Sequence, residues 1–159
     1  MKVAIASGKG GTGKTTVASN LAHQMSQTEK IILVDLDVEE PNSGLFIKGD
    51  LVEERVISLM IPEWDEDKCN GSGLCQDVCN FGAIIQIGTE VMVLPELCHS
   101  CFACSTLCPD KALPMKPSRI GELKHYQSDK LHFIEGRIDV GQEQATPLIG
   151  QTIEYANKI

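Results

Sequence analysis

The chain has 159 residues, of which 42% are hydrophobic, and it carries 22 carboxylates against 14 lysines and arginines. This length allows one ordinary hydrophobic core or two small ones. The net negative charge argues against a broad nucleic-acid surface, which needs a basic stripe, and against docking on anionic lipid. No apolar stretch approaches the ~20 residues of a membrane span, and the N-terminus does not look like a secretory signal, so we expect a cytoplasmic protein.

The first part of the chain alternates between strand-like and helix-like patterns. Residues 2–7 form an apolar run that predicts a buried parallel strand, and residues 31–35 predict a second one. Between them, residues 14–26 predict a helix, whose apolar positions at helical spacing are Val17, Leu21, Ala22 and Met25. Strand, loop, helix and strand in this order predict a βαβ unit with a right-handed crossover. Residues 55–61 predict a further strand that ends at Pro62.

The composition changes at Glu63, after which the chain is rich in glycine and cysteine and has few large apolar side chains. This segment contains an internal repeat, because residues 68–84 parallel residues 97–113. A duplicated unit that is too small to build its own core is typical of a fold in which metal clusters act as the core.

Towards the end of the chain the strand-like alternation resumes at residues 131–140. A helix is expected from Pro147, with Ile149, Ile153 and Ala156 on one face. We therefore expect an N-terminal segment at residues 1–62, an inserted domain at 63–117 and a return segment at 118–159.

A glycine-rich loop, Gly-Lys-Gly-Gly-Thr-Gly-Lys-Thr, occupies residues 8–15. Such a loop can turn its backbone N–H groups towards a phosphate, with Lys14 on the terminal phosphates of ATP and Thr15 on Mg²⁺. The glycine spacing also fits a dinucleotide-binding loop or a turn without a ligand, but the Lys-Thr pair favours a phosphate loop. The residues expected to contact the nucleotide are Gly8, Gly10, Gly11, Thr12, Gly13, Lys14, Thr15 and Thr16.

Two carboxylates, Asp35 and Asp37, follow the second predicted strand. Ligand sites of α/β proteins form at the ends of parallel strands, so these carboxylates could hold Mg²⁺-bound water or orient an attacking water. The structural alternative is a cap of the strand end.

All seven cysteines lie between Cys69 and Cys108, which in a reducing compartment indicates metal ligation and not disulfides. The second run, Cys98-x2-Cys101-x2-Cys104-x3-Cys108-Pro109, has the bacterial two-cluster ferredoxin pattern, in which the fourth cysteine crosses to the other cluster. A zinc ribbon is the alternative, but the triple spacing exceeds what tetrahedral zinc needs. The pattern assigns Cys79, Cys98, Cys101 and Cys104 to one 4Fe–4S cluster, and Cys69, Cys75 and Cys108 to the other.

Ser72 stands where the first run lacks a cysteine. Because an oxygen ligand suits iron–sulfide less well than thiolate does, three outcomes are open at this site. The site holds a 3Fe–4S cluster, or a labile 4Fe–4S cluster with Ser72 or water at one iron, or no cluster. His99 lies between two better ligands, so we expect it to be a hydrogen-bond donor near the second cluster or a solvated side chain.

The run from Lys9 to Thr15 resembles the deviant Walker A loop of the MinD/Mrp and nitrogenase iron-protein ATPases. With Asp-Leu-Asp-Val-Glu-Glu-Pro-Asn at 35–42, the cysteine-rich segment and Glu-Gly-Arg-Ile-Asp-Val-Gly at 135–141, the whole chain resembles MinD-superfamily ATPases with an inserted ferredoxin domain. The resemblance implies an α/β P-loop domain with a parallel sheet, a ferredoxin-like α+β insert, and a homodimer that sandwiches the nucleotide. It implies that Lys9 reaches the partner's phosphates, that Asp37 positions the attacking water and that Asp35 holds the waters of Mg²⁺.

Members of that family continue into a second switch strand, and nothing after Lys124 matches it. We therefore expect an incomplete nucleotide domain, either an N-terminal fragment or a short form completed by a partner, that hydrolyses nothing by itself. The function expected of the full protein is ATP hydrolysis coupled to low-potential electron transfer to a redox partner. The alternatives are delivery of iron–sulfur clusters to an acceptor protein, and a ferredoxin-type carrier with a non-hydrolysing nucleotide domain.

Overall fold

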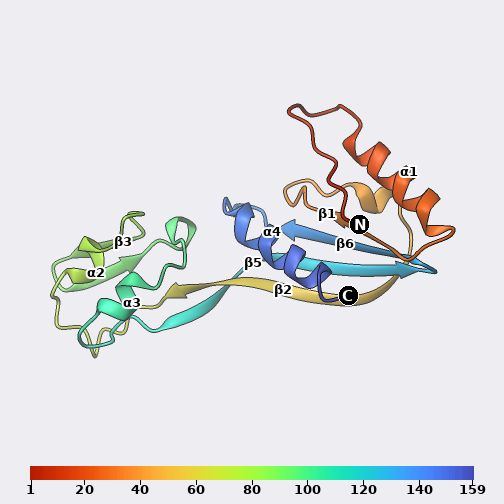
Figure 1. Ribbon diagram of the computed structural model, residues 1–159. Helices are drawn as coiled ribbons and strands as arrows, with labels where there is room; N and C mark the ends of the chain where they lie inside the picture. Colours follow the sequence, from red (N-terminus) through yellow and green to blue (C-terminus); the bar gives the residue numbers. More distant parts are fainter. The chain divides into compact units, whose positions relative to one another are not determined.

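The computed structural model describes residues 1–159 and divides them into two compact units (Figure 1). The first unit comprises Met1–Ile57 and Ile120–Ile159, and the second comprises Ser58–Arg119. The chain passes from the first unit to the second within strand β2 (Asp50–Pro62) and returns within strand β5 (Met115–Ser128). None of the helices has both the length and the apolar character that crossing a membrane requires.

A four-stranded sheet in the order β1-β6-β5-β2 forms the centre of the first unit. Strand β1 (Ile31–Asp35) pairs in parallel with β6 (Leu131–Ile138), and the register runs from Ile31 opposite Leu131 to Asp35 opposite Glu135. Strand β6 pairs antiparallel with β5. The expected parallel sheet is therefore a mixed sheet, while the strand predicted at residues 31–35 is confirmed.

The strand predicted at residues 2–7 is wrong, because these residues adopt no regular structure and nearly all of them are exposed. An apolar run becomes a buried parallel strand only where neighbouring strands and covering helices enclose it. Strand β1 lies at the edge of the sheet and pairs with β6 alone, and residues 2–7 do not pair with its free edge. The predicted βαβ unit is wrong for the same reason, and the parallel partner of β1 comes from the far end of the chain.

Helix α1 (Lys14–Ser26) has the predicted bounds and covers the face of the sheet that carries Leu131 and Phe133 (Figure 1). Its buried residues are Ser19 and Ala22, and a short 3-10 helix, η1 (Ser43–Leu45), lies beside it. The predicted apolar face is only partly buried, because Val17 and Leu21 remain 56% and 42% exposed.

Helix α4 (Ala145–Ala156) covers the opposite face of β6, where alternate residues point. A Cβ atom at Gly136 would lie 2.7 Å from Thr152 Oγ1, so only glycine allows this close approach. The buried face of α4 comprises Leu148, Thr152 and Tyr155. The predicted face of Ile149, Ile153 and Ala156 is wrong by one position, because hydrogen bonds satisfy the two hydroxyls and allow their burial.

Four polar side chains form a continuous chain of hydrogen bonds on the α4 side of the sheet. His132 Nδ1 lies 2.9 Å from His125 Nε2, His125 Nδ1 lies 2.9 Å from the Tyr155 hydroxyl, and that hydroxyl donates to Glu53 at 2.8 Å. Because the tyrosine proton goes to Glu53, His125 must donate through Nδ1 and accept through Nε2, and His132 must donate through Nδ1. His125, which donates through one ring nitrogen and accepts through the other, is therefore neutral in this arrangement.

The second unit contains two similar halves that bear the cysteines. The first half has helix α2 (Leu74–Asp77) and a hairpin of β3 (Ile84–Ile87) and β4 (Glu90–Val93); the second has the 3-10 helix η2 (Pro95–Leu97) and helix α3 (Ala103–Leu107). Three left-handed backbone positions of the first half have counterparts along the repeat, while a fourth, Gly88, lies in the turn between β3 and β4. The corresponding pairs are Gly71 and Ser100, Gly73 and Phe102, and Gly82 and Lys111. The sequence repeat is therefore also a repeat of backbone conformation.

The buried histidines predict that stability falls in acid. Burial is the main cause that lowers the pKa of both His125 and His132 below the ordinary 6.5. The unfolded chain then binds protons that the folded chain does not. The contribution of these histidines to stability is therefore fully present above about pH 6.5 and is lost as the pH falls below that value. Urea unfolding of the chain at several values between about pH 5 and 7.5 measures this slope.

His125→Gln and His132→Gln should each flatten that slope, by up to about one proton per histidine. His23→Gln is the matched control, because His23 is exposed on α1. Stability that stays constant between pH 7.5 and 5 in the unmodified chain would contradict the prediction.

Candidate functional sites

The glycine-rich loop precedes α1 and is held together by its own side chains. Ser7 Oγ donates to the Lys9 carbonyl at 2.9 Å, and Thr12 Oγ1 donates to Ser7 Oγ at 2.8 Å. Gly11 and Gly13 have φ angles of 71° and 87°, a left-handed conformation that glycine adopts without strain. No atom lies within 4 Å of where their Cβ atoms would stand, so the backbone of the loop is accessible.

The loop leads directly into the N-terminus of α1. Gly13 is the N-cap of this helix, and no side chain caps it. Its first N–H groups, which come from residues 14–16, therefore keep their hydrogen-bonding capacity for a ligand. Such N–H groups and the positive end of the helix dipole suit a phosphate group, and Lys14 and Thr15 lie in this first turn.

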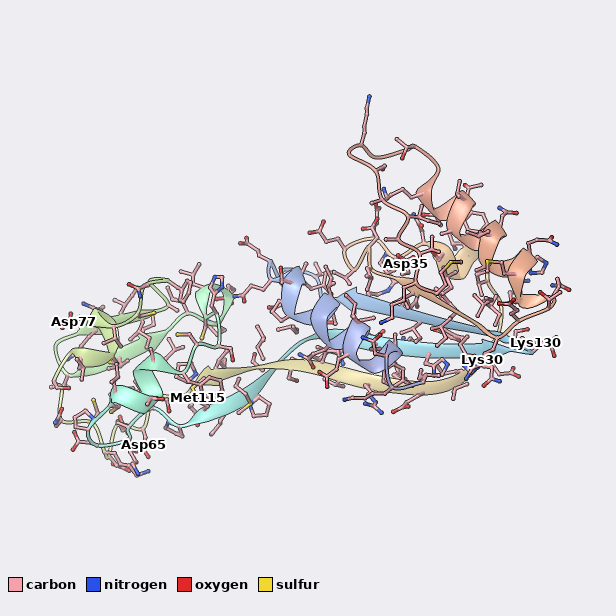
Figure 2. The ribbon with its side chains drawn as sticks, viewed as in Figure 1. Lys30, Asp35, Asp65, Asp77, Met115 and Lys130 are labelled. Atoms are coloured by element: carbon pink, nitrogen blue, oxygen red, sulfur yellow. The ribbon has the colours of Figure 1, made fainter.

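The segment that follows β1 connects Asp35 with the start of α1. Asp35 lies at the end of β1 (Figure 2), where its Oδ2 accepts a hydrogen bond from Ser43 N at 3.0 Å. Asn42, the next residue towards β1, accepts a hydrogen bond from Thr15 Oγ1 at 2.8 Å. The structure thus connects the two predicted magnesium ligands, Thr15 and Asp35, through residues 42 and 43. Asn42 was not predicted, although its place beside Pro41 at the end of the acidic motif was a possible signal.

A second carboxylate that was not predicted lies next to Asp35. Glu135 stands opposite Asp35 in the β1–β6 register and is only 8% exposed. Burial is the main cause that raises the pKa of Glu135, and the charge of Asp35 raises it further. A Cβ atom on Gly44 would lie 3.3 Å from Glu135 Oε2, so both carboxylates border the segment of residues 42–44.

The two other residues of the predicted site, Lys9 and Asp37, are exposed. The backbone N–H of Asp37 donates to Asp35 Oδ1 at 3.1 Å, but neither the Lys9 nor the Asp37 side chain bonds to Thr15 or Asp35. Their expected roles in catalysis stay predictions.

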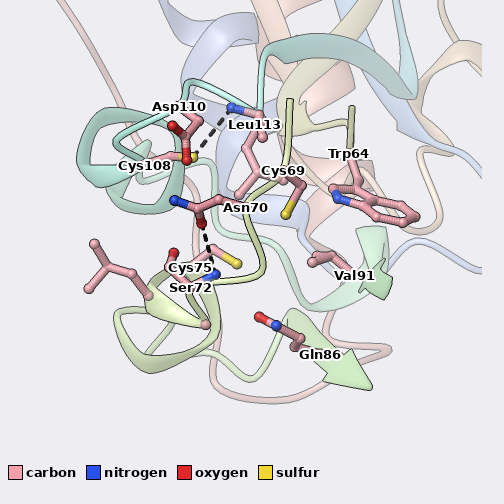
Figure 3. Close-up of a pocket in the computed structure, with 13 residues that line it drawn as sticks. Trp64, Cys69, Asn70, Ser72, Cys75, Gln86, Val91, Cys108, Asp110 and Leu113 are labelled. Atoms are coloured by element: carbon pink, nitrogen blue, oxygen red, sulfur yellow. Dashed lines mark hydrogen bonds between the residues drawn. The ribbon is translucent and has the colours of Figure 1, made fainter. Parts of the chain in front are cut away.

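The seven cysteines line two separate pockets of the second unit. Each pocket spans about 330–340 Å³ of space between atoms when the adjoining open solvent is included. One cysteine of each pocket, Cys108 in the first and Cys79 in the second, comes from the half that supplies the other pocket. The first pocket (Figure 3) is lined by Cys69, Cys75, Cys108 and Ser72, and the second by Cys79, Cys98, Cys101 and Cys104.

The two crossing cysteines have equivalent surroundings. The N–H of Ala83 donates to Cys79 Sγ and the N–H of Ala112 donates to Cys108 Sγ, both at 3.3 Å. None of the seven cysteines forms a disulfide. Burial is the main cause that raises the pKa of Cys104 to about 11, so this thiol stays protonated at neutral pH unless a metal displaces the proton.

The donor sets of the two pockets differ in how completely they fit an iron–sulfur cluster. No group of three or more His, Cys, Asp or Glu side chains is arranged so that it could hold a single metal ion. In a cuboidal cluster each thiolate binds its own iron, so thiols placed around a cavity are the suitable donor set. The second pocket offers four thiols and the first offers three, with Ser72 in the remaining place.

Comparisons with known proteins identify a family and several relatives. The model of the CobQ/CobB/MinD/ParA nucleotide binding domain matches residues 3–155. Uncharacterized protein MJ0579 of Methanocaldococcus jannaschii is 30% identical over 157 residues, which are 98% of this chain and 56% of that protein. The chain therefore spans about half the length of this relative.

Two shorter matches come from the same organism. Uncharacterized ATP-binding protein MJ0410 is 37% identical over 70 residues, which cover 36% of this chain and 26% of that protein. Uncharacterized ferredoxin MJ0722 is 38% identical over 56 residues, which cover 33% of this chain and 73% of that protein.

The contact between Asp35 and Ser43 can be tested without any ligand. Ser43 is buried, so Asp35→Ala should leave its N–H without an acceptor and destabilise the segment of residues 42–44 by about 1–3 kcal/mol. We expect the amide hydrogen of Ser43 to exchange faster with solvent deuterium by at least about tenfold. Glu39→Ala is the control, because Glu39 is exposed and also lies between β1 and η1. Equal exchange of the Ser43 amide hydrogen in the two variants would show that Asp35 does not stabilise residues 42–44.

Proposed function

Because the chain belongs to the CobQ/CobB/MinD/ParA family of nucleotide-binding domains, we propose that it binds ATP and two iron–sulfur clusters and couples ATP binding and hydrolysis to low-potential electron transfer. The observation that carries the iron–sulfur part is the exchange of Cys79 and Cys108 between the two halves of the second unit. Since the chain spans about half of its relative MJ0579, the complete reaction belongs to the full protein.

In this proposal the first unit holds the nucleotide at the start of α1. The N–H groups of the loop and of the first helical turn would bind the phosphates, and Lys14 would neutralise their charge. Thr15 would bind Mg²⁺ through its hydroxyl, with Asp35 placed to hold the waters of the metal. Support comes from the uncapped N-terminus of α1 and from the hydrogen bonds that connect Thr15 to Asn42 and Asp35 to Ser43.

The second unit is proposed to be the inserted ferredoxin-like domain. When bound, its clusters would supply two one-electron carriers. The side chains of this unit would hold them through the thiolates of the two pockets, while the N–H groups of Ala83 and Ala112 donate to thiolate sulfur. The 38% identity to part of an uncharacterized ferredoxin supports this assignment.

We propose that two copies of the full protein sandwich the nucleotide. Lys9 would then act on the phosphates of the partner, and Asp37 would position the attacking water. Both side chains are exposed, which is the accessibility that such roles need. A change in the dimer with the nucleotide state would then alter the surroundings of the clusters, which is the proposed coupling.

A second candidate function is delivery of iron–sulfur clusters to an acceptor protein. The observation that favours it is the first pocket, where three thiols and Ser72 would hold a cluster less firmly than four thiols. Transfer of iron and sulfide to a metal-free acceptor would support delivery. A reversible redox titration without loss of iron would support electron transfer.

The exchange of cysteines between halves predicts a crossed pattern of cluster loss. After anaerobic reconstitution, Cys108→Ser should disturb the cluster of the first pocket, although Cys108 belongs to the second cysteine run. Cys79→Ser should disturb the cluster of the second pocket. Electron paramagnetic resonance and iron counts would distinguish the two clusters, with Ser105→Ala, which changes no cysteine, as control. If each substitution instead disturbed the cluster held by the other cysteines of its own run, the exchange of Cys79 and Cys108 between the halves would be contradicted.

The nucleotide part predicts that MgATP shifts the reduction potential of the clusters in the full protein. Lys14→Ala should weaken MgATP binding by at least about tenfold and abolish the shift, because it removes the positive charge closest to the phosphates. Lys48→Ala is the control, since Lys48 is exposed and lies outside the loop. Calorimetry and redox titration measure the two effects, and unchanged binding in Lys14→Ala would refute the nucleotide assignment.

A further inference from the structure

The two cysteine pockets differ at two positions that correspond when the spacing of the internal repeat is continued to residue 115. Ser72 and Gln86 line the first pocket, and their counterparts Cys101 and Met115 line the second. Trp64 also lines the first pocket, whereas Val93, which lies at the same spacing from it, does not line the second. The absence of the fourth cysteine from the first pocket is therefore accompanied by two further polar groups around the same cavity.

The amide of Gln86 has a defined orientation and an acceptor without a donor. Its Nε2 donates to the carbonyls of Gly71 at 3.0 Å and Gly88 at 2.9 Å, and these two bonds fix which end of the amide is oxygen. Gln86 Oε1 is buried and has no hydrogen-bond partner. A Cβ atom on Gly73 would lie 3.6 Å from this oxygen, which places the free acceptor beside the residue that follows Ser72.

Trp64 contributes the opposite group to the same pocket. Its indole Nε1 is buried and has no acceptor. Figure 3 shows this nitrogen turned towards the side of the pocket where Cys69 lies. A cluster sulfur or cysteine thiolate can accept a hydrogen bond from the indole N–H, but neither can donate to Gln86 Oε1. Binding of a cluster alone would therefore satisfy Trp64 and leave Gln86 unsatisfied.

The Ser72 side of the pocket is open to solvent. Ser72, Asn70 and Asp110 are all exposed, while Cys69, Cys75 and Cys108 are half-buried. The N–H of Ser72 donates to Asn70 Oδ1 at 2.9 Å, which ties the backbone here to a neighbouring polar side chain. A small molecule from solvent can thus reach the corner that lacks a thiol.

We propose that the first pocket binds a four-iron cluster through three cysteine thiolates, and that its fourth iron takes an exchangeable oxygen ligand whose O–H donates to Gln86 Oε1. The ligand is water or the hydroxyl group of a small molecule. This inference rests on the proposed binding of two clusters. It makes the first pocket a ligand-binding site, whereas the second pocket, with four thiols and Met115 in place of Gln86, has no corner for a ligand and serves electron transfer.

The test uses the full chain, reconstituted anaerobically with iron and sulfide and transferred into ¹⁷O-enriched water. Electron–nuclear double resonance of the reduced clusters should show ¹⁷O coupling at one cluster. Ser72→Cys should abolish this coupling, because a fourth thiolate fills the corner. Cys101→Ser is the matched control in the second pocket, and it should leave the ¹⁷O coupling of the first cluster unchanged.

Gln86→Met gives the first pocket the residue of the second and removes the acceptor, together with the two hydrogen bonds that Nε2 donates to Gly71 and Gly88. We expect mild oxidation to release the fourth iron at least about tenfold faster than in the unmodified chain, the change that loss of the hydrogen bond to the ligand alone would produce. The three-iron signal in electron paramagnetic resonance measures this release. Met115→Gln, at the corresponding position of the second pocket, should leave the rate unchanged.

Three results would overturn the proposal, and they are distinguishable from each other. Two intact four-iron clusters without ¹⁷O coupling would show that Ser72 or another protein group fills the corner. A three-iron cluster that takes up no fourth iron from excess ferrous iron would show that the corner is empty. Absence of iron from both pockets would reject the two-cluster function together with this inference.

Discussion

The parallel pairing of β1 with β6 is the contact on which the first unit depends. It joins segments from opposite ends of the chain, and the residues between them include Ser58–Arg119, which form a compact unit of their own. The pairing buries Phe133 under α1 and brings Leu148 of α4 onto the other face. It also places Asp35 opposite Glu135, at the strand ends where residues 42–44 meet the start of α1.

In the second unit the exchange of cysteines replaces much of a hydrophobic core. Each pocket takes one cysteine from the other half, so neither half could complete its own set of thiols. The apolar residues that pack between the halves are few, with Ile84, Val91 and Leu113 the main buried aliphatic side chains. Bound clusters would therefore contribute to the folding of this unit as well as to its chemistry.

The differences between the two pockets suggest a division of roles. The second pocket has four thiols and mainly apolar surroundings, which include the stacked rings of Phe81 and His99. The first pocket has three thiols and two buried polar atoms without partners. The backbone conformation is therefore repeated while these side chains differ, as the proposed division between electron transfer and ligand binding requires.

The sequence by itself determined the local features: the bounds of α1 and β1, the glycine loop, and the internal repeat, because these depend on short-range spacing and on residue type. Only the tertiary structure decided which strands meet, which is why residues 2–7 form no strand and the sheet is mixed. It also revealed the buried Glu135 and histidine chain, and the hydrogen bond between Asn42 and Thr15, because each of these depends on contacts between separate elements of the fold. Burial of a polar group depends on partners distant in the sequence, and no local pattern encodes them.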